Sequence, residues 1–280
     1  MRIAFGEDGM MMMKMKYLVA AGLACVTAPC VAAADQATAP ASMSPRLGQG
    51  YLKGGVMADS LALSPPPPAP GSASEARDRE ASAAGLALKG SARWSLATRD
   101  ADLFGPGATG ALSCALGVDI SAKTTPRLDR LLRRTIADLG MSTSAIKHAF
   151  NRERPFTVNR QPTCTPDWES MLVKDGSYPS GHSAIGYGWG LILAELRPER
   201  AALLVARGRA FGDSRRICNA HWLSDIEEGR IAAAATVSRL NADPAFQKDL
   251  KGARAELKRA KAQPRDCDGE RAALSLTPTP

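Results

Sequence analysis

The stretch GSYPSGHSAIGYGWGLILAEL, from Gly176 to Leu196, joins a glycine-bearing turn to a long apolar segment. The apolar part predicts a helix over residues 184–196, ended by a proline two residues later. Ser180 and Gly181 then lie at a helix N-terminus, where backbone N–H groups and the helix dipole favour an anion. Glycine lets the backbone approach that anion closely, and His182 would stand beside it. An ordinary turn with a capping serine and a surface histidine is the alternative interpretation.

Helical patterns extend over most of the remaining chain. They begin near Ser74, resume after Thr125-Pro126, and continue over residues 199–211 and 221–240; Asp243-Pro244 then opens a last helix to about residue 261. Alanine and leucine dominate, aromatic residues are only 5%, and no run alternates with a period of two. The sequence therefore predicts an all-α fold, a single compact helical domain. The positions expected to face inward are Leu128, Leu131, Leu132, Ile136, Leu139, Ile226, Ile231, Ala234 and Val237.

Two cations precede the opening stretch. Lys147 and Arg154 are seven residues apart, nearly two helical turns, so on one helix they would point the same way. Pro155 would then stop that helix. Two cations on one face suit an oxyanion, with arginine as a bidentate fork and lysine as a point charge. A solvated basic face is the alternative, because Arg152 is adjacent.

A third segment follows the apolar helix. Ser214-Arg215 is followed by His221, and Asp225 lies one helical turn further on. Histidine and aspartate four residues apart can form a hydrogen bond on a helix face, where the carboxylate would fix the imidazole tautomer. A structural surface pair is the alternative. The chain contains three histidines, and His148 is the one that is not part of a motif with arginine, glycine or aspartate at a fixed spacing. We expect no role for it.

The N-terminus is typical of a targeting segment. Two lysines precede an apolar stretch that ends in Ala32-Ala33-Ala34, an A-x-A cleavage site, so residues 1–34 are predicted to be a signal peptide. Residues 35–57 would form a flexible lead-in, 58–265 the helical domain and 266–280 a C-terminal tail. No later window is apolar enough to span a membrane. We therefore expect a periplasmic or secreted protein that has no membrane partner after signal cleavage.

The net charge and the cysteines limit which ligands and cross-links are expected. The formal net charge is +8, but the basic residues are scattered rather than clustered, so nucleic-acid binding is not expected. Four cysteines follow the signal peptide, and an even number in an oxidising compartment suggests two disulfides, with three possible connectivities. A zinc site is the rival interpretation, but there is no CxxC pair. These cysteines are Cys114, Cys164, Cys218 and Cys267.

The three segments occur in a specific order: Lys-x6-Arg-Pro, Pro-Ser-Gly-His, then Ser-Arg-x5-His-x3-Asp. Together they resemble the type 2 phosphatidic acid phosphatase and vanadium haloperoxidase superfamily, and most closely its class A bacterial non-specific acid phosphatases. The octet 176–183 is similar to the signature of that branch, with Ser183 where threonine is usual. The resemblance covers roughly residues 58–260. It places Pro65–Pro68 inside the folded domain and implies a homo-oligomer. Cys164 and Cys218 match cysteines of the family, whereas Cys114 and Cys267 are additional, so we expect disulfides 164–218 and 114–267.

The resemblance also implies roles for the site residues. His221 would be the nucleophile that forms a phosphohistidine, Asp225 would orient it, and His182 would act as general acid and then general base. The phosphoryl oxygens of small phosphate monoesters would be bound without metal or other cofactor by Lys147, Arg154, Ser180, Gly181 and Arg215. Arg216 and Asn219 differ from the family pattern and are expected to alter substrate range.

Alternative activities use the same pocket. They are phosphotransfer to alcohols, apyrase-like cleavage and vanadium-dependent halide oxidation. A lipid phosphatase and a phosphate-binding protein without turnover are the remaining alternatives. The latter needs neither a positioned nucleophile nor an acid.

Overall fold

The computed structural model describes residues 47–53, 59–261 and 267–277. Within these ranges the secondary structure is helical and contains no strand, which confirms the predicted all-α class. The helices are α2 (Ser60–Leu63), α3 (Ala73–Leu86), α4 (Ala92–Asp100), α5 (Ser113–Leu116), α6 (Pro126–Met141), α7 (Ser144–Phe150), α8 (Pro155–Asn159), α9 (Glu169–Leu172), α10 (Gly181–Leu196), α11 (Ala201–Ile217), α12 (Leu223–Asn241), α13 (Pro244–Leu257) and α14 (Asp268–Ser275). The short 3-10 helices η1 (Ala108–Leu112), η2 (Pro166–Trp168) and η3 (Pro198–Arg200) connect some of them.

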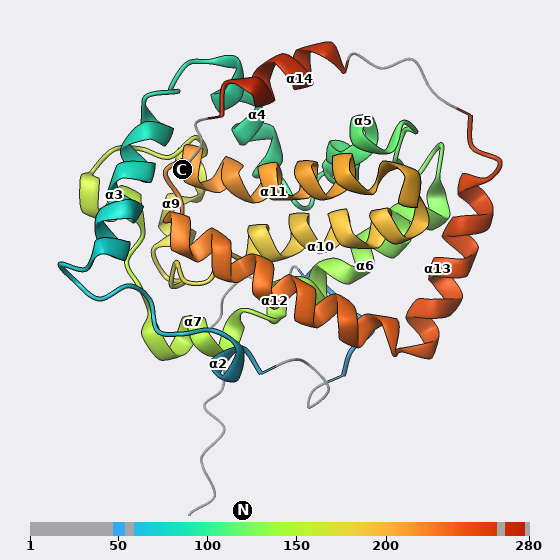
Figure 1. Ribbon diagram of the computed structural model, residues 1–280, viewed down its shortest axis with the longest axis horizontal. Coiled ribbons are helices and arrows are strands. Elements are labelled where there is room, and N and C mark those ends of the chain that lie inside the picture. Colours follow the sequence, from blue (N-terminus) through green and yellow to red (C-terminus); the bar gives the residue numbers. More distant parts are fainter. Residues whose placement is uncertain (1–46, 54–58, 262–266, 278–280) are drawn as a thin grey trace, which may run out of the picture. The chain divides into compact units, whose positions relative to one another are not determined.

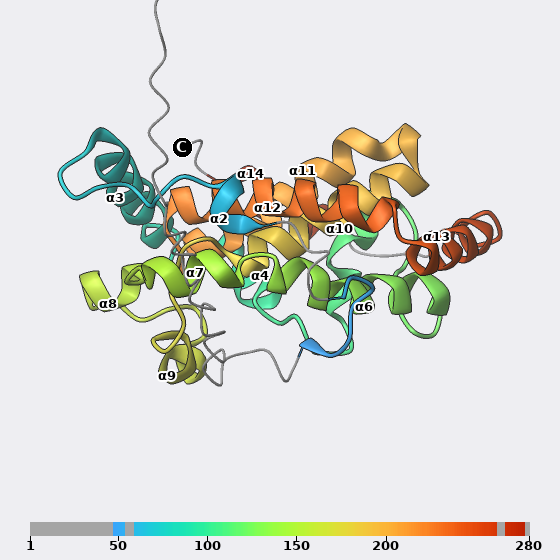
Figure 2. The ribbon, with the colours of Figure 1, turned by 90° about the horizontal axis from the view of Figure 1, so that it is seen from below.

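Helix α10 is the centre of the domain. It lies between α11 and α12 (Figure 1), and α6 and α7 lie on one side of the layer that these three helices form (Figure 2). Trp189 in α10 is fully buried, and its Nε1 donates to the carbonyl oxygen of Leu132 in α6 at 3.0 Å. All five apolar α6 positions predicted to face inward are at most 4% exposed. The long apolar helix is therefore covered by packed neighbours, as its composition requires.

Two glycines allow the neighbouring helices to approach α10. A Cβ at Gly208 of α11 would lie 2.7 Å from the carbonyl oxygen of Gly186, and one at Gly229 of α12 would lie 2.5 Å from that of Ser180. Neither distance is compatible with a side chain, so both contacts require glycine. The second contact holds α12 against the N-terminal turn of α10, which belongs to the candidate site.

The inward face of α12 differs from the prediction. Ile226 and Val237 are buried as expected, but Ile231 is 48% exposed and Ala234 is also exposed. The buried stripe instead continues through Ala233 and Leu240, at the spacing of a helix side that faces α10. The predicted pair at 231 and 234 therefore lies on the solvent side.

The geometry predicted for Lys147 and Arg154 was wrong. Helix α7 ends at Phe150, and Asn151 follows in the left-handed conformation with φ of 39°. Arg154 is extended and serves as the N-cap residue of α8, in which Pro155 is the first residue. Proline suits a first helical turn, because its missing N–H has no partner to lose there, and it favours an extended residue before it. Pro155 thus begins a helix where the sequence suggested that it ends one.

Part of the predicted lead-in packs against the domain. The carboxylate of Asp138 accepts hydrogen bonds from the backbone N–H groups of Tyr51, at 2.9 and 3.0 Å, and of Leu52. Tyr51 is 5% exposed, its ring meets Phe246 edge to face, and its hydroxyl donates to Asp249. Residues 47–53 are therefore held by specific contacts rather than flexible. The predicted signal peptide and the rest of the lead-in lie outside the described residues.

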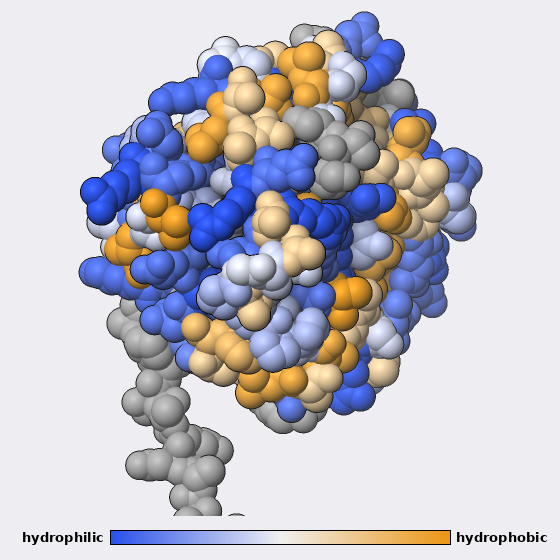
Figure 3. Space-filling model, turned by 60° about the vertical axis from the view of Figure 1, so that its left-hand side comes forward, coloured by the Kyte–Doolittle hydropathy of each residue, from blue (hydrophilic) through white to orange (hydrophobic). Residues whose placement is uncertain are grey.

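The chain after α13 also contributes to the fold. Disulfides join Cys164 to Cys218 and Cys114 to Cys267, which confirms the expected pairing. Residues 268–275, which we expected in a tail, form α14 against α4. Pro65 likewise accepts a hydrogen bond from the Tyr178 hydroxyl, so the proline run belongs to the packed structure. Among the described helices, none is long and apolar enough to cross a membrane. On the face seen in Figure 3, hydrophobic residues form small separate groups among hydrophilic ones.

Candidate active site

Four chain segments meet at one cavity. Lys147 comes from α7, Arg154 from the start of α8, Gly181 and His182 from the first turn of α10, and His221 from the loop before α12. The other lining residues are Leu47, Leu103, Gly140, Met141, Thr143, Ser144, His148, Leu172, Asp175 and Ile185. The cavity thus combines an apolar wall with the cations and histidines that the sequence predicted to act together.

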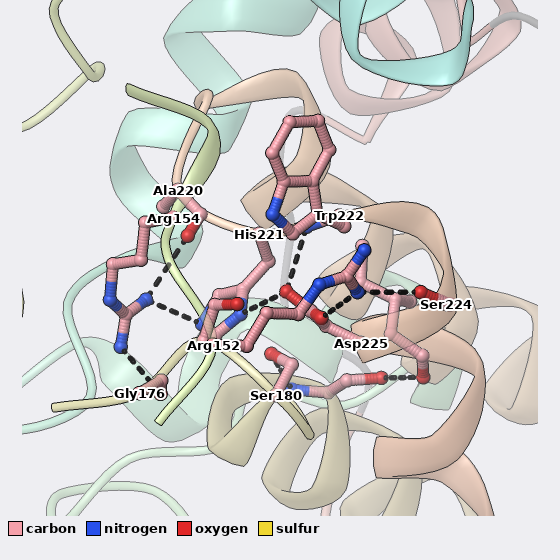
Figure 4. A network of polar contacts seen from close by, with 12 residues as sticks. Arg152, Arg154, Gly176, Ser180, Ala220, His221, Trp222, Ser224 and Asp225 are labelled. Carbon is pink, nitrogen blue, oxygen red and sulfur yellow. Dashed lines mark hydrogen bonds and ion pairs between the residues drawn. The ribbon is translucent and has the colours of Figure 1, made fainter. Parts of the chain in front are cut away.

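His221 lies between an acceptor and a donor (Figure 4). Its Nδ1 is 3.2 Å from Oδ2 of Asp225, and its Nε2 is 3.0 Å from Nη1 of Arg154. A carboxylate can only accept and a guanidinium can only donate, so Nδ1 carries the proton and Nε2 presents a lone pair. Burial, with Arg154 next in effect, holds the pKa of His221 well below its usual value. The imidazole is therefore neutral, in the tautomer that a nucleophile needs.

The His221–Asp225 pair is not arranged on a helix face as predicted. His221 precedes Trp222, the N-cap residue of α12, and Asp225 is the third residue of that helix. The Asp225 carboxylate turns back to accept the Trp222 N–H at 2.8 Å. The contact was correctly predicted, but a capping interaction produces it.

Arg154 is fixed mainly by backbone carbonyl groups. Its Nε donates to Leu172 at 2.8 Å, its Nη1 to Ala220 at 3.0 Å and its Nη2 to Gly176 at 3.3 Å. These acceptors orient the guanidinium without neutralising it. The positive charge of Arg154 therefore remains available to attract an anion in the cavity.

Lys147 shares a carboxylate with Arg154. Both cations lie 3.5 Å from Oδ2 of Asp175, and the Lys147 ammonium also donates to the Gly176 carbonyl. Burial lowers the pKa of Lys147 to about 8. Asp175 was not predicted, because a single aspartate between two motifs has no spacing that marks it.

Arg215 is a buried cation with unused donors. It is 0% exposed, and its Nη1 lies 3.4 Å from Sγ of Cys218. Its Nε and Nη2 have no hydrogen-bond partner among the described residues. Burial and nearby Arg154 lower the pKa of Arg215 to about 9. Leaving such donors unpaired destabilises the empty site, and an oxyanion would satisfy them.

The first turn of α10 is shaped as the sequence predicted. Ser180 is the N-cap residue, and its Oγ accepts the Ser183 N–H at 3.2 Å. The Ser180 N–H donates to the Asp225 carbonyl oxygen at 2.8 Å, which ties this turn to the start of α12. Gly181 follows as the first helical residue and faces the cavity. The position suits an anion, because the first N–H groups of a helix lack intrahelical partners.

His182 completes the set. Its Nε2 is 3.0 Å from the carbonyl oxygen of Ala101, which can only accept, so Nε2 carries a proton and Nδ1 remains for proton exchange. Burial, and then the positive field of Arg215, holds its pKa well below the usual value. Five of the eight predicted site residues line the cavity: Lys147, Arg154, Gly181, His182 and His221. Asp225 holds His221, whereas Ser180 and Arg215 are buried and do not line the cavity.

Sequence reasoning missed a second set behind the cavity. Arg152, which the sequence brought in only as part of the alternative of a solvated basic face, is 13% exposed and binds both Asp225 and Asp78 at 2.7 Å. The only sequence signal was its position two residues before Arg154. Asp78 lies in α3, far away in the chain, and has no signal at all.

The sequence analysis also singled out His148, Arg216 and Asn219, which lie at the cavity edge or away from the cavity. His148 lies exposed at the cavity edge. Arg216 donates to the Ala81 carbonyl in α3, and Asn219 exchanges hydrogen bonds with Asn159. Neither Arg216 nor Asn219 lines the cavity, so their contacts give no support to the expected effect on substrate range.

Comparison with known proteins agrees with this geometry. Residues 134–244 match the PAP2 superfamily. A non-specific acid phosphatase of Providencia stuartii is 40% identical over 212 residues, which cover 75% of this chain and 86% of the relative. The chain belongs to the bacterial non-specific acid phosphatases of the PAP2 superfamily.

Two further relatives of this acid phosphatase family have similar identities. The non-specific acid phosphatase of Salmonella typhimurium is 44% identical over 179 residues, which cover 64% of this chain and 72% of the relative. The acid phosphatase of Zymomonas mobilis is 42% identical over 174 residues, or 62% of this chain and 66% of the relative. Within the described ranges, no group of three or more histidine, cysteine, aspartate or glutamate side chains is arranged to hold a metal ion.

Proposed function

We propose that this chain is a secreted, metal-independent acid phosphatase that hydrolyses phosphate monoesters of broad specificity through a phosphohistidine. One observation carries the proposal: His221, which lines the cavity, is held in its nucleophilic tautomer between Asp225 and Arg154. A protein that only binds phosphate needs the cations but no imidazole held in this way.

In the first step, the phosphoryl oxygens are bound by Lys147, Arg154 and Arg215, with the Ser180 hydroxyl and the Gly181 N–H. Arg154 then leaves His221 for a phosphoryl oxygen, which frees the Nε2 lone pair. Nε2 attacks phosphorus, and the bond from phosphorus to the ester oxygen breaks. The proton on His182 moves to the departing oxygen, and Asp225 stabilises the positive charge that develops on the His221 ring.

In the second step, water replaces the alcohol. Neutral His182 accepts a proton from the water as its oxygen attacks phosphorus, and the phosphorus–nitrogen bond breaks. The electron pair returns to His221 Nε2, and inorganic phosphate leaves. A sugar or nucleoside hydroxyl in place of water would give phosphotransfer from the same intermediate, so this alternative activity differs only in the acceptor.

The histidine pKa values account for activity at acid pH. His221 must be neutral, so activity is lost as pH falls through its lowered pKa; His182 must be protonated, so activity is lost as pH rises through its own lowered pKa. Because both values lie below the ordinary 6.5, the profile of kcat/KM should be bell-shaped with an acidic optimum. A bound phosphate dianion favours protonated His182, so the basic limb of kcat should lie at higher pH than that of kcat/KM.

The test is hydrolysis of p-nitrophenyl phosphate by the protein without residues 1–34, with EDTA, between pH 4 and 9. We expect EDTA-resistant turnover with the bell-shaped profile described above. No turnover by folded protein would contradict the proposal. Vanadate-dependent oxidation of bromide, measured on the same sample, would then indicate the haloperoxidase alternative.

Replacement of His182 by alanine should affect substrates unequally. The p-nitrophenolate ion leaves without a proton, whereas an alkoxide needs one. We therefore expect the variant to lose about 10²–10⁴-fold in kcat/KM for glycerol phosphate, and much less for p-nitrophenyl phosphate. Pre-steady-state kinetics should show a burst of p-nitrophenol, because the second step still lacks its base. Equal losses for both substrates would rule out the general-acid role.

Export and assembly are part of the proposal. The signal-like segment 1–34 and the two disulfides support a periplasmic or secreted location. A homo-oligomer is proposed from the family resemblance alone. Analytical ultracentrifugation of the mature protein would test it.

A further inference from the structure

Behind the candidate nucleophile lies a chain of charges that reaches α3. Arg152 Nη1 donates to Oδ1 of Asp225 and its Nη2 to Oδ2 of Asp78, both at 2.7 Å. Nη1 also donates to the Ser224 hydroxyl at 2.8 Å. Figure 4 shows Arg152 next to the Asp225 carboxylate, which lies between it and His221. Two buried carboxylates therefore share one arginine.

Each oxygen of Asp225 has a separate task. Oδ1 accepts from Arg152, whereas Oδ2 accepts from the Trp222 N–H and from His221 Nδ1. With Oδ1 occupied, the carboxylate cannot rotate without breaking a charge-assisted hydrogen bond. Arg152 thereby fixes which oxygen meets the imidazole.

Arg152 itself is held from the far side. Asp78 is 1% exposed and accepts from the Ser224 N–H at 2.8 Å and the Ser224 hydroxyl at 2.6 Å. The Arg152 guanidinium also lies 5.4 Å from the centre of the Trp222 ring. In an ordinary surface ion pair the carboxylate is exposed to water. Asp78 is instead buried and held by two hydrogen bonds, so it fixes the position of Arg152.

We propose that Arg152, anchored by Asp78, is a positioning residue for the reaction: it holds the Asp225 carboxylate ionised and oriented toward Nδ1 of His221. This inference rests on the proposed function, since it assigns the support of the same nucleophile. Arg152 does not line the cavity and contacts no reacting atom. It acts through Asp225 alone.

Charge explains why this support is needed at acid pH. Burial raises the pKa of Asp225, and the positive charge of Arg152 opposes this rise more strongly than any other group. The other charged and titratable groups that face Asp225 are His221, Lys147, Arg154, Tyr178 and, through Arg152, Asp78. Without Arg152 the carboxyl group would take up a proton at a higher pH and could no longer accept from Nδ1.

The main test replaces Arg152 by methionine. We expect kcat for p-nitrophenyl phosphate to fall at least about 10-fold with little change in KM, because the phosphate ligands are untouched. The acid limb of the kcat profile should move to higher pH. Replacement of Arg77 by methionine is the matched control, because Arg77 also links α3 to α12 but is 51% exposed, and both of its hydrogen bonds go to Glu227, at 2.7 and 3.0 Å. Its kcat and acid limb should equal those of the wild type.

A second variant separates the orientation of Arg152 from its charge. It changes the buried side chain less, so we expect it to fold. Asp78→Asn keeps the size of the side chain and leaves Arg152 charged, but weakens its anchor. We expect kcat to fall about 10-fold without a shift of the acid limb to higher pH. Glu227→Gln, at the exposed pair, is its control and should have no effect. Wild-type kcat in Asp78→Asn would overturn the anchoring role.

A spectroscopic measurement makes the test independent of turnover. The chain has only three histidines, so ¹⁵N-histidine labelling yields three imidazoles. The His221 Nδ1–H proton should give a low-field resonance in the wild type that disappears at a higher pH in Arg152→Met. If that variant keeps both the resonance and the acid limb of the wild type, and loses only thermal stability, the inference is wrong. Should the wild type show no turnover, the proposed function fails, and this resonance still decides the positioning role.

Discussion

Replacement of His221 by alanine is expected to lower kcat/KM for p-nitrophenyl phosphate by at least about 10⁴-fold and to abolish any covalent phosphoenzyme. No other imidazole in the cavity is held as His221 is, because His182 Nε2 is bound to the Ala101 carbonyl and His148 is exposed at the cavity edge. The cations and the helix N-terminus remain in the variant. It should therefore still bind inorganic phosphate.

The phosphoenzyme gives the more direct measurement. After rapid mixing with ³²P-labelled substrate, a base-stable and acid-labile label should appear on the wild type and be absent from the variant. His148→Ala serves as control, because His148 is exposed at the cavity edge, and it should form the label normally. A label that persists in His221→Ala would transfer the nucleophilic role to another residue.

Replacement of Arg215 by methionine should stabilise the protein while it removes most activity. The buried guanidinium has two donor nitrogens without partners among the described residues, and leaving buried donors unpaired costs free energy. Methionine fills a similar volume without that cost. We expect the free energy of unfolding to rise by about 1–3 kcal/mol, or roughly 2–10 °C in Tm. We expect kcat/KM to fall by about 10³-fold, because a charge on the transition state is lost.

Thermal unfolding with and without inorganic phosphate tests both parts. Phosphate should raise Tm of the wild type more than that of the variant, because a ligand that binds more tightly stabilises the folded state more. Arg216→Met is the matched control: Arg216 is also buried, but it donates to the Ala81 carbonyl at 2.7 Å. That control should lower Tm and keep kcat/KM near the wild-type value. A lower Tm for Arg215→Met would show that Arg215 stabilises the empty fold.

Local signals predicted the elements that carry the site. The leucine pattern before Leu139 gave α6, and Ser180 followed by an apolar run gave the start of α10. Asp243-Pro244 gave the start of α13 in the same way. In each case the interactions that start the helix lie within one turn of the residue concerned. A local sequence pattern is therefore sufficient to predict the helix.

Geometry between segments could not be predicted in this way. The seven-residue spacing of Lys147 and Arg154 suggested one helix face, whereas a left-handed Asn151 and an extended Arg154 bring the cations together across a break. The pairing of Arg152 with Asp78 depends on how α3 packs against α12, which no local pattern encodes. The family resemblance supplied the site residues because it carries tertiary information that single motifs lack.

The two disulfides have a consequence for cleavage of the chain. Cys114 and Cys267 enclose all eight predicted site residues, and Cys164 and Cys218 close a smaller ring inside that one. One peptide bond cut between residues 114 and 267 therefore leaves a single covalent molecule, with both fragments still joined. A cut between residues 164 and 218 opens both rings and still leaves two covalent links between the fragments. Wherever the protein meets a protease, the segments of the candidate site would stay tethered after a first cut.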